Sequence, residues 1–266
     1  MTAVGTGVYV TEQKSGKVSY RSSLTYKNKH IALGSYDTYE LAKKVYEEGC
    51  LILADRNYSV DGNREGLSIP FEKFVILINF RDNGIYSANP LYIRKNYISY
   101  YLSEEAEYKF SVDDLFYYAT HRILKRGGHM YVNDYGMQVN LKARYGIKNY
   151  AAEGRDYRFI NGDRYDMRYE NLEILNTYNG VEYISGTRKR GFRTKIHLRS
   201  DLIVGYYDDA IQAAIAYNKA IDILKRRGCK KEFEANYLEG ITGKTYADIY
   251  SGIKIGKNIE NRRETV

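Results

Sequence analysis

The chain has 266 residues, enough for one large domain or for two or three small ones. It carries 41 Lys and Arg against 33 Asp and Glu, a formal net charge of +8. This balance favours a polyanionic partner, because neutralising phosphates releases counterions, although an ordinary basic enzyme fits the charge equally well. Only the positions of the basic residues can distinguish a polyanion-binding protein from an ordinary basic enzyme.

The chain is poor in metal-binding side chains, with only two Cys, four His and no CxxC pair. A zinc site is therefore unfavoured, and we expect no metal and no cofactor. Two isolated cysteines suit a reducing compartment. The first residues lack the pattern of a signal peptide, and no apolar run reaches the roughly 20 residues of a membrane span. We expect a soluble, intracellular protein with no membrane partner.

The first segment, residues 1–57, predicts three short strands followed by one helix. In YRSSL (20–24) the alternation of polar and apolar residues places Arg21 and Ser23 on the solvent face. Asp37 stands where the N-cap of the helix belongs, because a short carboxylate accepts from free backbone N–H groups. The segment therefore predicts a small sheet covered by one helix.

The next segment, residues 58–112, is a connector without a functional interpretation. The apolar run from Phe71 to Leu77 is rich in β-forming residues and indicates β-structure. Pro90 interrupts the chain, and Tyr97–Tyr101 predicts another buried segment.

Residues 113–178 form the central segment. A helix is predicted from Asp113 through Ala119 to the pair Gly127-Gly128, where glycine ends it. From Met130 onward, short β elements follow in MYVNDYGMQVNL and NLEIL.

Two motifs of this segment resemble the HNH (ββα-metal) nuclease module: INGD (160–163) matches its Ile-Asp-Gly-Asn loop, and DMRYENL (166–172) matches its Asn-Asn-Arg-x-x-Asn-Leu helix. The module needs Asp-His or His-His directly before the Ile, to hold a divalent metal and to deprotonate water. Arg158 and Phe159 stand there instead, so we expect a dead scaffold with no catalytic residue. The degenerate positions are Arg158, Phe159, Asn161, Asp163, Asp166 and Asn171.

The fourth segment, residues 179–238, repeats the order of the first, and 239–266 is a C-terminal tail. FRTKI (192–196) exposes Arg193 and Lys195 by alternation, and Asp208 stands at the N-cap position. Six cations occur in TRKRGFRTKIHLR with no acid between them. Like charges on one small sheet repel one another unless a phosphate backbone neutralises them.

Both end segments resemble the Apetala-2/ethylene-response-factor DNA-binding domain. The signature of this family is a Gly-Val opening, an aromatic-x-Ala-x-Ile strand, a Leu-Gly-x-Phe-x-Thr corner and an Ala-Ala-x-x-Tyr helix. In the first segment these four features are matched, in order, by GV, YRSSL, LGSYDT and the following helix. In the fourth segment they are matched by GV, FRTKI, VGYYDD and AAIAY. The resemblance implies a three-stranded sheet in the major groove that reads bases with strand side chains. The candidate DNA contacts are Tyr9, Arg21, Ser23, His30, Tyr183, Arg188, Lys189, Arg190, Arg193, Lys195, His197 and Arg199.

These observations predict an α+β fold with two small sheet-plus-helix domains around a central ββα-type module. The resemblance implies a sequence-specific double-stranded DNA-binding protein, a transcription regulator that reads a bipartite site as a monomer. It would be cytoplasmic and nucleoid-associated, in a bacterium or a phage-infected cell. The alternatives are an active HNH-type homing or restriction endonuclease with unconventional metal ligands, and an RNA-binding or ribosome-associated protein suggested by the 30 Tyr.

Overall fold

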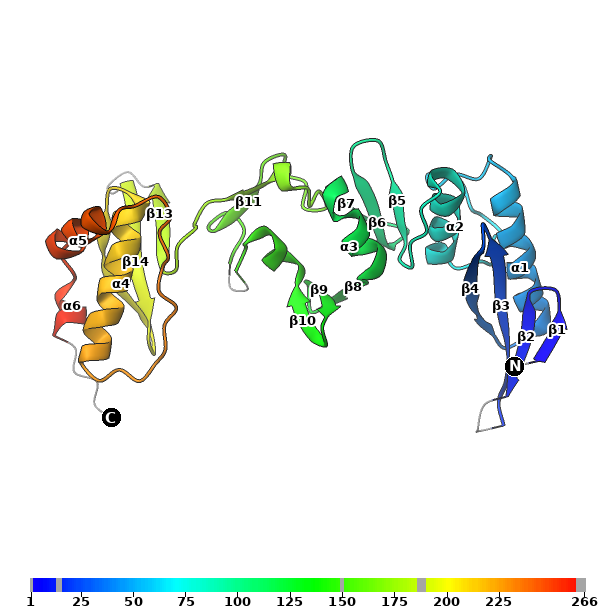
Figure 1. The fold of residues 1–266 in the computed structure, drawn as a ribbon, viewed down its shortest axis with the longest axis horizontal. Coiled ribbons are helices and arrows are strands. Elements are labelled where there is room, and N and C mark those ends of the chain that lie inside the picture. Colours follow the sequence, from blue (N-terminus) through cyan, green and yellow to red (C-terminus); the bar gives the residue numbers. More distant parts are fainter. Residues whose placement is uncertain (1, 13–15, 149–150, 186–189, 262–266) are drawn as a thin grey trace. The chain divides into compact units, whose positions relative to one another are not determined.

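The chain has the predicted α+β fold, with helices and several small antiparallel sheets, in a computed structural model (Figure 1). The structure describes residues 2–12, 16–148, 151–185 and 190–261. The chain divides into two compact units, which are considered separately below. Unit 1 comprises Met1–Tyr145 with Asp163–Asn171, and unit 2 comprises Gly146–Gly162 with Leu172–Val266.

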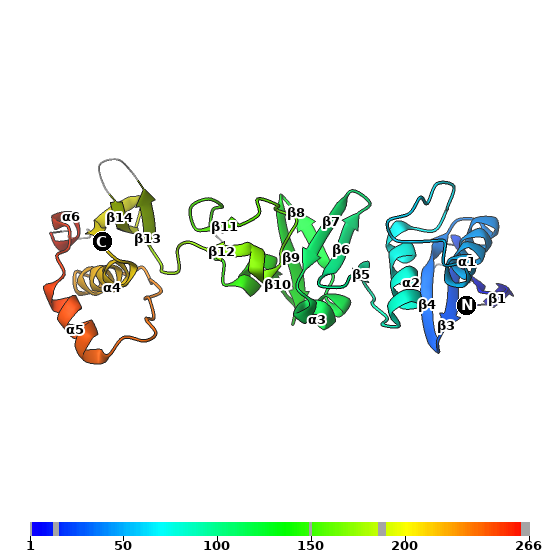
Figure 2. The ribbon, with the colours of Figure 1, turned by 90° about the horizontal axis from the view of Figure 1, so that it is seen from above.

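The first segment folds as predicted into strands followed by a helix, with one strand more than expected at the start. A four-stranded antiparallel sheet has the order β1-β2-β3-β4. The elements are β1 (Thr2–Gly5), β2 (Val8–Glu12), β3 (Val18–Tyr26), β4 (Lys29–Tyr36) and α1 (Tyr39–Ala54). α1 packs against β3 and β4 (Figure 2). We call β2–β4 with α1 the first copy.

A β-bulge lies in the pairing of β3 with β4. Ser22 pairs with Gly34 but Ser23 pairs with Ala32, so Leu33 is an extra residue on β4. The prediction that Ser23 faces solvent is wrong, since it is only 3% exposed. Its backbone N–H donates to the carbonyl of Gly7 (2.9 Å), and the chain at this turn therefore lies against Ser23.

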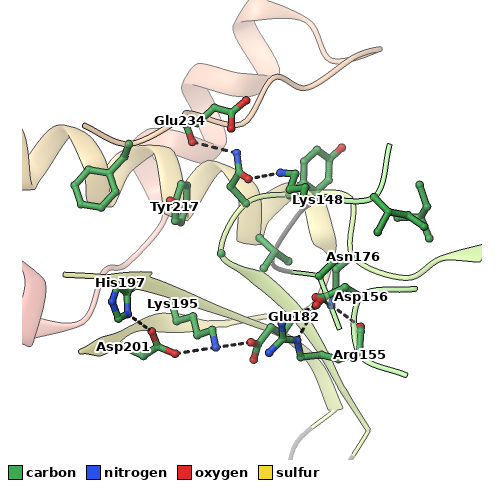
Figure 3. Close-up of a pocket in the computed structure, with 18 of the residues that line it drawn as sticks. Lys148, Arg155, Asp156, Asn176, Glu182, Lys195, His197, Asp201, Tyr217 and Glu234 are labelled. Atoms are coloured by element: carbon green, nitrogen blue, oxygen red, sulfur yellow. Dashed lines mark hydrogen bonds and ion pairs between the residues drawn. The ribbon is translucent and has the colours of Figure 1, made fainter. Parts of the chain in front are cut away.

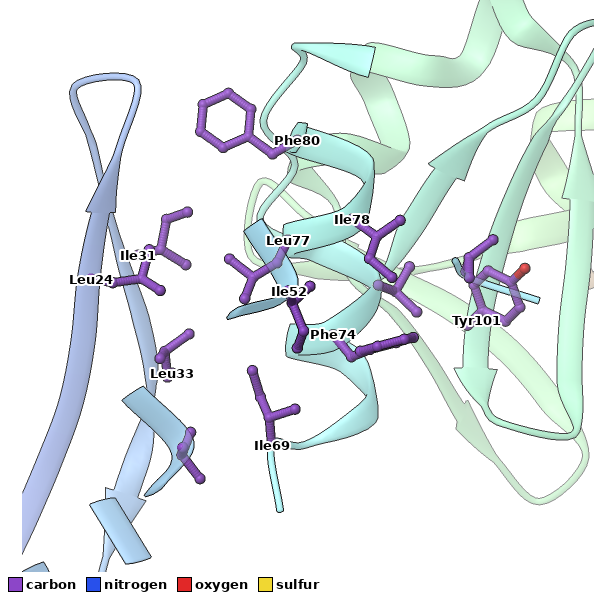
Figure 4. Close-up of a cluster of buried hydrophobic side chains, with 13 residues drawn as sticks. Leu24, Ile31, Leu33, Ile52, Ile69, Phe74, Leu77, Ile78, Phe80 and Tyr101 are labelled. Atoms are coloured by element: carbon purple, nitrogen blue, oxygen red, sulfur yellow. The ribbon is translucent and has the colours of Figure 1, made fainter. Parts of the chain in front are cut away.

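The apolar run from Phe71 is a helix, α2 (Phe71–Asn83), and not the predicted β-structure. It joins the core of the first copy: Leu77 points toward the sheet, whereas Ile78 points to the opposite side, toward Tyr101 (Figure 4). Because both sides of the helix are buried, its sequence lacks the one-sided stripe of a surface helix. The helix ends at Gly84, which has φ 71°.

The rest of unit 1 consists of short elements. They are β5 (Leu91–Ile93), β6 (Ile98–Ser103), β7 (Ala106–Phe110), η1 (Val112–Asp114), α3 (Leu115–Thr120), β8 (Ile123–Arg126), β9 (His129–Asp134), β10 (Met137–Asn140), η2 (Leu141–Tyr145) and η3 (Tyr169–Asn171). The buried segment predicted around Tyr97–Tyr101 is confirmed as β6. The helix predicted from Asp113 is wrong beyond Thr120, because Gly127 and Gly128 form the turn of the β8–β9 hairpin with φ 56° and 82°.

Unit 2 contains a two-stranded sheet and the second sheet-plus-helix repeat, as predicted. The elements are β11 (Tyr157–Phe159), β12 (Leu172–Ile174), β13 (Val181–Ser185), β14 (Arg190–His197), β15 (Asp201–Tyr207), α4 (Ala210–Arg226), α5 (Gly243–Gly252) and α6 (Lys257–Glu260). α4 covers one face of the β13-β14-β15 sheet, and α5 and α6 pack on α4. We call β13–β15 with α4 the second copy.

The N-caps of the two repeat helices lie one residue later than predicted. The N-caps are Thr38 and Asp209, whose side chains accept from the backbone N–H three residues ahead (3.3 and 2.8 Å). The predicted caps, Asp37 and Asp208, are displaced by this shift, and Asp37 pairs with Lys17 instead (2.9 Å). No helix of the described residues is long and apolar enough to cross a bilayer.

Candidate nucleic-acid interface

The two copies share the same backbone irregularity. In the second copy Thr194 pairs with Gly205 and Lys195 with Ile203, which leaves Val204 as the extra residue of a bulge. The first copy has its bulge at the equivalent place, on the last strand before the helix. This register makes Arg193 equivalent to Arg21, and Lys195 equivalent to Ser23.

The copies also share a glycine that no other residue can replace without strain. Gly7 and Gly180 have φ of 72° and 69°, and their carbonyls accept from the central strand of each sheet (2.9 and 2.8 Å). A Cβ at Gly7 would lie 2.1 Å from the ring of Tyr46, and one at Gly180 would lie 2.4 Å from the ring of Tyr217. The tyrosine of each helix therefore packs directly on the backbone of this turn.

The sheet face of the second copy that faces away from α4 carries a chain of ion pairs. Thr194 points to the helix side, where its Oγ1 donates to a helix carbonyl (2.9 Å), so its neighbours in β14 point outward. Glu182 binds Arg193 Nη2 (2.5 Å) and Lys195 Nζ (2.6 Å). Asp201 in turn binds Lys195 Nζ (2.9 Å) and an outward histidine (2.7 Å). We call this set the sheet-face network: Glu182, Arg193, Lys195, His197 and Asp201.

The charges of the sheet-face network stabilise one another. Burial opposes ionisation of Glu182, but hydrogen bonds from Lys195 and Arg193 outweigh it and lower the pKa of Glu182. Hydrogen bonds from Lys195 and His197 lower the pKa of Asp201. Burial opposes charge on Lys195 too, yet the two carboxylates raise its pKa. Arg193 and Lys195 are therefore paired with carboxylates from β13 and β15, which corrects the expectation that only a phosphate backbone could neutralise them.

The other predicted contacts of the second copy lie around this face. Tyr183 is 52% exposed and packs edge-on against Phe192, with ring centroids 5.3 Å apart. Arg199 is exposed in the turn between β14 and β15. Arg188 and Lys189 lie outside the described residues, and so does the side chain of Arg190.

The outward face of the first copy differs in its side chains. Tyr9 pairs with Arg21 across β2 and β3, at the position that Glu182 holds in the second copy. His30 is exposed and stands where the second copy has Asp201. The first copy therefore has no carboxylate at either of the two positions that hold the sheet-face network together.

The positions before the nuclease-like loop have structural roles in unit 2. Phe159 is 9% exposed at the end of β11. Arg158 Nε donates to Glu173 (2.5 Å) across the β11–β12 pair. A guanidinium and a phenyl ring offer no ligand for a cation.

The remaining nuclease-like positions stabilise turns. Asn161 is exposed, just beyond the end of β11 in unit 2. In unit 1, Asp163 accepts from the backbone two residues ahead (2.9 Å). Asp166 is 1% exposed and accepts from Arg168 (2.8 and 2.7 Å), and Asn171 donates to the Asp166 carbonyl (2.8 Å). The helix predicted over 166–172 is reduced to the short turn η3. Among the described residues, no group of three or more His, Cys, Asp or Glu is placed to hold a metal ion.

Sequence reasoning missed the two carboxylates of the network and the cavity beside it. The available signal was weak: Glu182 precedes Arg193 by a strand and a turn, and Asp201 follows His197 by four residues. The cavity measures about 520 Å³, and Lys195 and Asp201 lie along one side of it (Figure 3). On its opposite side Lys148 Nζ donates to Asn179. Its lining residues come from 146–148, 151–156, 174–182, 195–201, Tyr217 and 231–234 of unit 2.

Comparison of the chain with protein-family models, with curated proteins and with solved structures finds no match.

Proposed function

We propose that the chain is a sequence-specific double-stranded DNA-binding protein that acts as a monomer and regulates transcription. The outward sheet face of each copy would lie in the major groove. The observation that carries this proposal is the sheet-face network, in which Glu182 holds Arg193 and Lys195 on the outward side of β14. Arg and Lys in the major groove bind the O6 and N7 atoms of guanine.

The fixed orientation of these cations supports base reading over general attraction to phosphate. A side chain already held in one orientation loses less entropy on binding than a free one. The charge of the network is nearly balanced, so the bases and not the backbone would set its preference. Glu182 is a positioning residue in this proposal, since its side chain is only 8% exposed.

The presence of two copies supports a bipartite site. One small sheet covers few base pairs, and linking two such contacts on one chain raises avidity by about 10²–10⁴-fold where the geometry allows both. The outward faces differ at Tyr9 and Glu182 and at His30 and Asp201, so the two half-sites would differ in sequence.

The deciding experiment is selection of full-length protein against a random pool of DNA duplexes, with total RNA as competitor. The proposal requires enrichment of a two-part motif. Full-length protein should then lose affinity for that motif when half a helical turn is inserted between its parts, since both faces must meet the groove. Recovery of no motif, or preferential capture of RNA, would overturn the proposal.

The endonuclease alternative makes an opposite prediction. Arg158 is held by Glu173 and Phe159 is buried, so we expect no cleavage of plasmid DNA with magnesium or manganese. Binding to the selected duplex should be the same with and without EDTA. Reproducible cutting that EDTA abolishes would favour the nuclease.

A further inference from the structure

A dense group of cations lies at one end of the second copy. Of these cations, only Arg199 is among the candidate DNA contacts considered so far. Five of them fall within Lys225–Lys231, at the end of α4 and just beyond it. All are exposed, and none forms an ion pair with a carboxylate of the described part of the chain. We call this group the basic end: Arg199, Lys225, Arg226, Arg227, Lys230 and Lys231.

The basic end is continuous with the outward sheet face. Leu198, in the β14–β15 turn, packs in one core cluster with Leu224 and Cys229. Lys231 Nζ donates to the carbonyl of His197 (2.9 Å), a member of the sheet-face network. The turn that carries Arg199 therefore lies against the segment that follows α4.

Local structure stabilises only some of these cations. Lys225 and Arg226 occupy the last turn of α4, where cations interact favourably with the helix dipole. Arg227, Lys230 and Lys231 lie beyond the last helical residue, and mutual repulsion among so many close cations disfavours the arrangement in the absence of a counter-charge. The cations of the sheet face are paired with carboxylates, whereas those of the basic end form no ion pair among the described residues.

We propose that the basic end binds the phosphate backbone of double-stranded DNA beside the bases that the second copy reads. The inference rests on the proposed function and deepens it by assigning different tasks to two surfaces. The basic end supplies most of the salt-dependent affinity of the second copy, and the sheet-face network supplies discrimination between sequences.

The side chains of the basic end favour DNA over a lipid surface. Peripheral membrane-binding segments combine cations with exposed apolar groups that enter the bilayer boundary. The only apolar residue among 225–231 is Cys229, which is 9% exposed and packs in the core. The surface is therefore charged without an apolar anchor, as a phosphate-backbone contact requires.

The test measures binding of full-length protein to a mixed-sequence DNA duplex several helical turns long, as a function of salt. The test variant combines Lys225→Gln, Arg227→Gln and Lys230→Gln, whose side chains are exposed. The matched control removes the same charge from exposed positions in unit 1, through Lys95→Gln, Lys125→Gln and Arg126→Gln. A third variant keeps the charge through Lys225→Arg, Arg227→Lys and Lys230→Arg. Circular dichroism checks that each variant is folded.

Each phosphate contact contributes about 0.9 to the slope of log affinity against log salt, so the test variant should lose roughly 2–3 in slope. The corresponding loss at about 0.1 M salt is on the order of 100-fold. The control and the charge-keeping variant should stay close to wild type.

Equal losses in the test variant and the control would show a general effect of net charge and would overturn the inference. An unchanged slope in the test variant, with a selected motif still bound, would overturn the inference alone. If wild-type protein binds no duplex, the proposed function fails as well. Binding of the wild type to phosphatidylserine–phosphatidylcholine vesicles that the test variant loses, without a loss on DNA, would assign the surface to lipid and also overturn it.

Discussion

The two copies differ in what they keep and what they change. The inner side of each repeat is the same: a bulge on the last strand, a left-handed glycine at the entry to the sheet, and a helix tyrosine packed on that glycine. The outward side is not the same, since Tyr9 stands at the position of Glu182 and His30 at the position of Asp201. The shared side maintains the fold of the repeat, and the variable side is where two different binding preferences would reside.

The largest expected effect comes from the shared glycine. Gly180→Ala places a Cβ 2.3 Å from the Lys195 carbonyl oxygen, a backbone atom that cannot turn away, and forces a left-handed residue. We expect a loss of about 2–5 kcal/mol in the free energy of unfolding, from backbone strain and overpacking together. Gly7→Ala should have a similar effect on the first copy. Urea unfolding measures the loss, and hydrogen exchange of strand peptides shows which copy opens.

Gly240→Ala is the control for this comparison. Gly240 also has a left-handed φ of 76°, but an added Cβ there meets nothing within 4 Å. Gly240→Ala should lower the free energy of unfolding by only about 1–2 kcal/mol, because it adds the strain of a left-handed backbone without overpacking. If Gly180→Ala costs no more than Gly240→Ala, the tyrosine–glycine contact is not part of what stabilises the repeat.

The shared side was largely predictable from sequence, because it depends on local periodicity and on the repeat itself. Strand alternation and helical spacing predicted a sheet followed by a helix in each repeat. The alignment of Gly34 with Gly205 located the corner between the last strand and the helix in both repeats. The bulge was not predictable, because one extra residue, Leu33 or Val204, leaves the pattern of a short strand almost unchanged. The burial of Ser23 was not predictable either, because the turn at Gly7 lies against it through a backbone hydrogen bond between residues far apart in the sequence.

The outward side was less predictable, because it depends on strand register. Glu182 meets Arg193 only through the pairing of β13 with β14, which spacing in the sequence does not define. α2 was misread for a related reason: with Leu77 and Ile78 buried on different sides, an apolar run has neither a helical stripe nor a strand alternation.

The next largest effect tests the outward faces as readers of bases. Arg193→Ala should weaken binding to the selected motif by about 1–3 kcal/mol, or about 5- to 150-fold, the energy of one good base contact. The loss should fall on one half-site, and Arg21→Ala should affect the other. Fluorescence anisotropy with duplexes mutated in each half measures this. Lys95→Ala, an exposed cation in unit 1, is the control. Uniform weakening on all sequences would instead assign Arg193 to phosphate.

A smaller effect in the opposite direction is expected at Glu182. Glu182→Gln keeps the shape of the side chain but leaves Arg193 and Lys195 with less counter-charge. Binding to mixed-sequence DNA should become tighter by about tenfold at about 0.1 M salt, with a slope steeper by about 0.9, as for one additional phosphate contact. Discrimination between sequences should fall. An affinity below wild type on every sequence would show that the carboxylate itself contacts DNA.

The reciprocal change sharpens the same comparison. Tyr9→Glu places a carboxylate opposite Arg21, as in the second copy. The affinity for mixed-sequence DNA should fall by about tenfold at about 0.1 M salt, because the new carboxylate neutralises Arg21 in place of one DNA phosphate. Tyr9→Phe, which removes only the hydroxyl, is the control and should leave the salt slope unchanged. Equal slopes for Tyr9→Glu and Tyr9→Phe would contradict the equivalence of the two positions.

The smallest effect concerns acid. The pKa of Glu182 is lowered from 4.5 and that of Asp201 from 3.8, so the folded network binds fewer protons than the unfolded chain. Its contribution to stability is therefore fully present above about pH 5 and is lost as the pH falls through the folded pKa values. Urea midpoints measured from pH 7 downward should fall less steeply for Glu182→Gln than for wild type, although the variant is less stable at pH 7. Glu239→Gln removes an exposed carboxylate of the same unit and should leave the acid dependence as in wild type. Parallel acid curves for wild type and Glu182→Gln would mean that the network does not contribute to the stability of the second copy through the charge of Glu182.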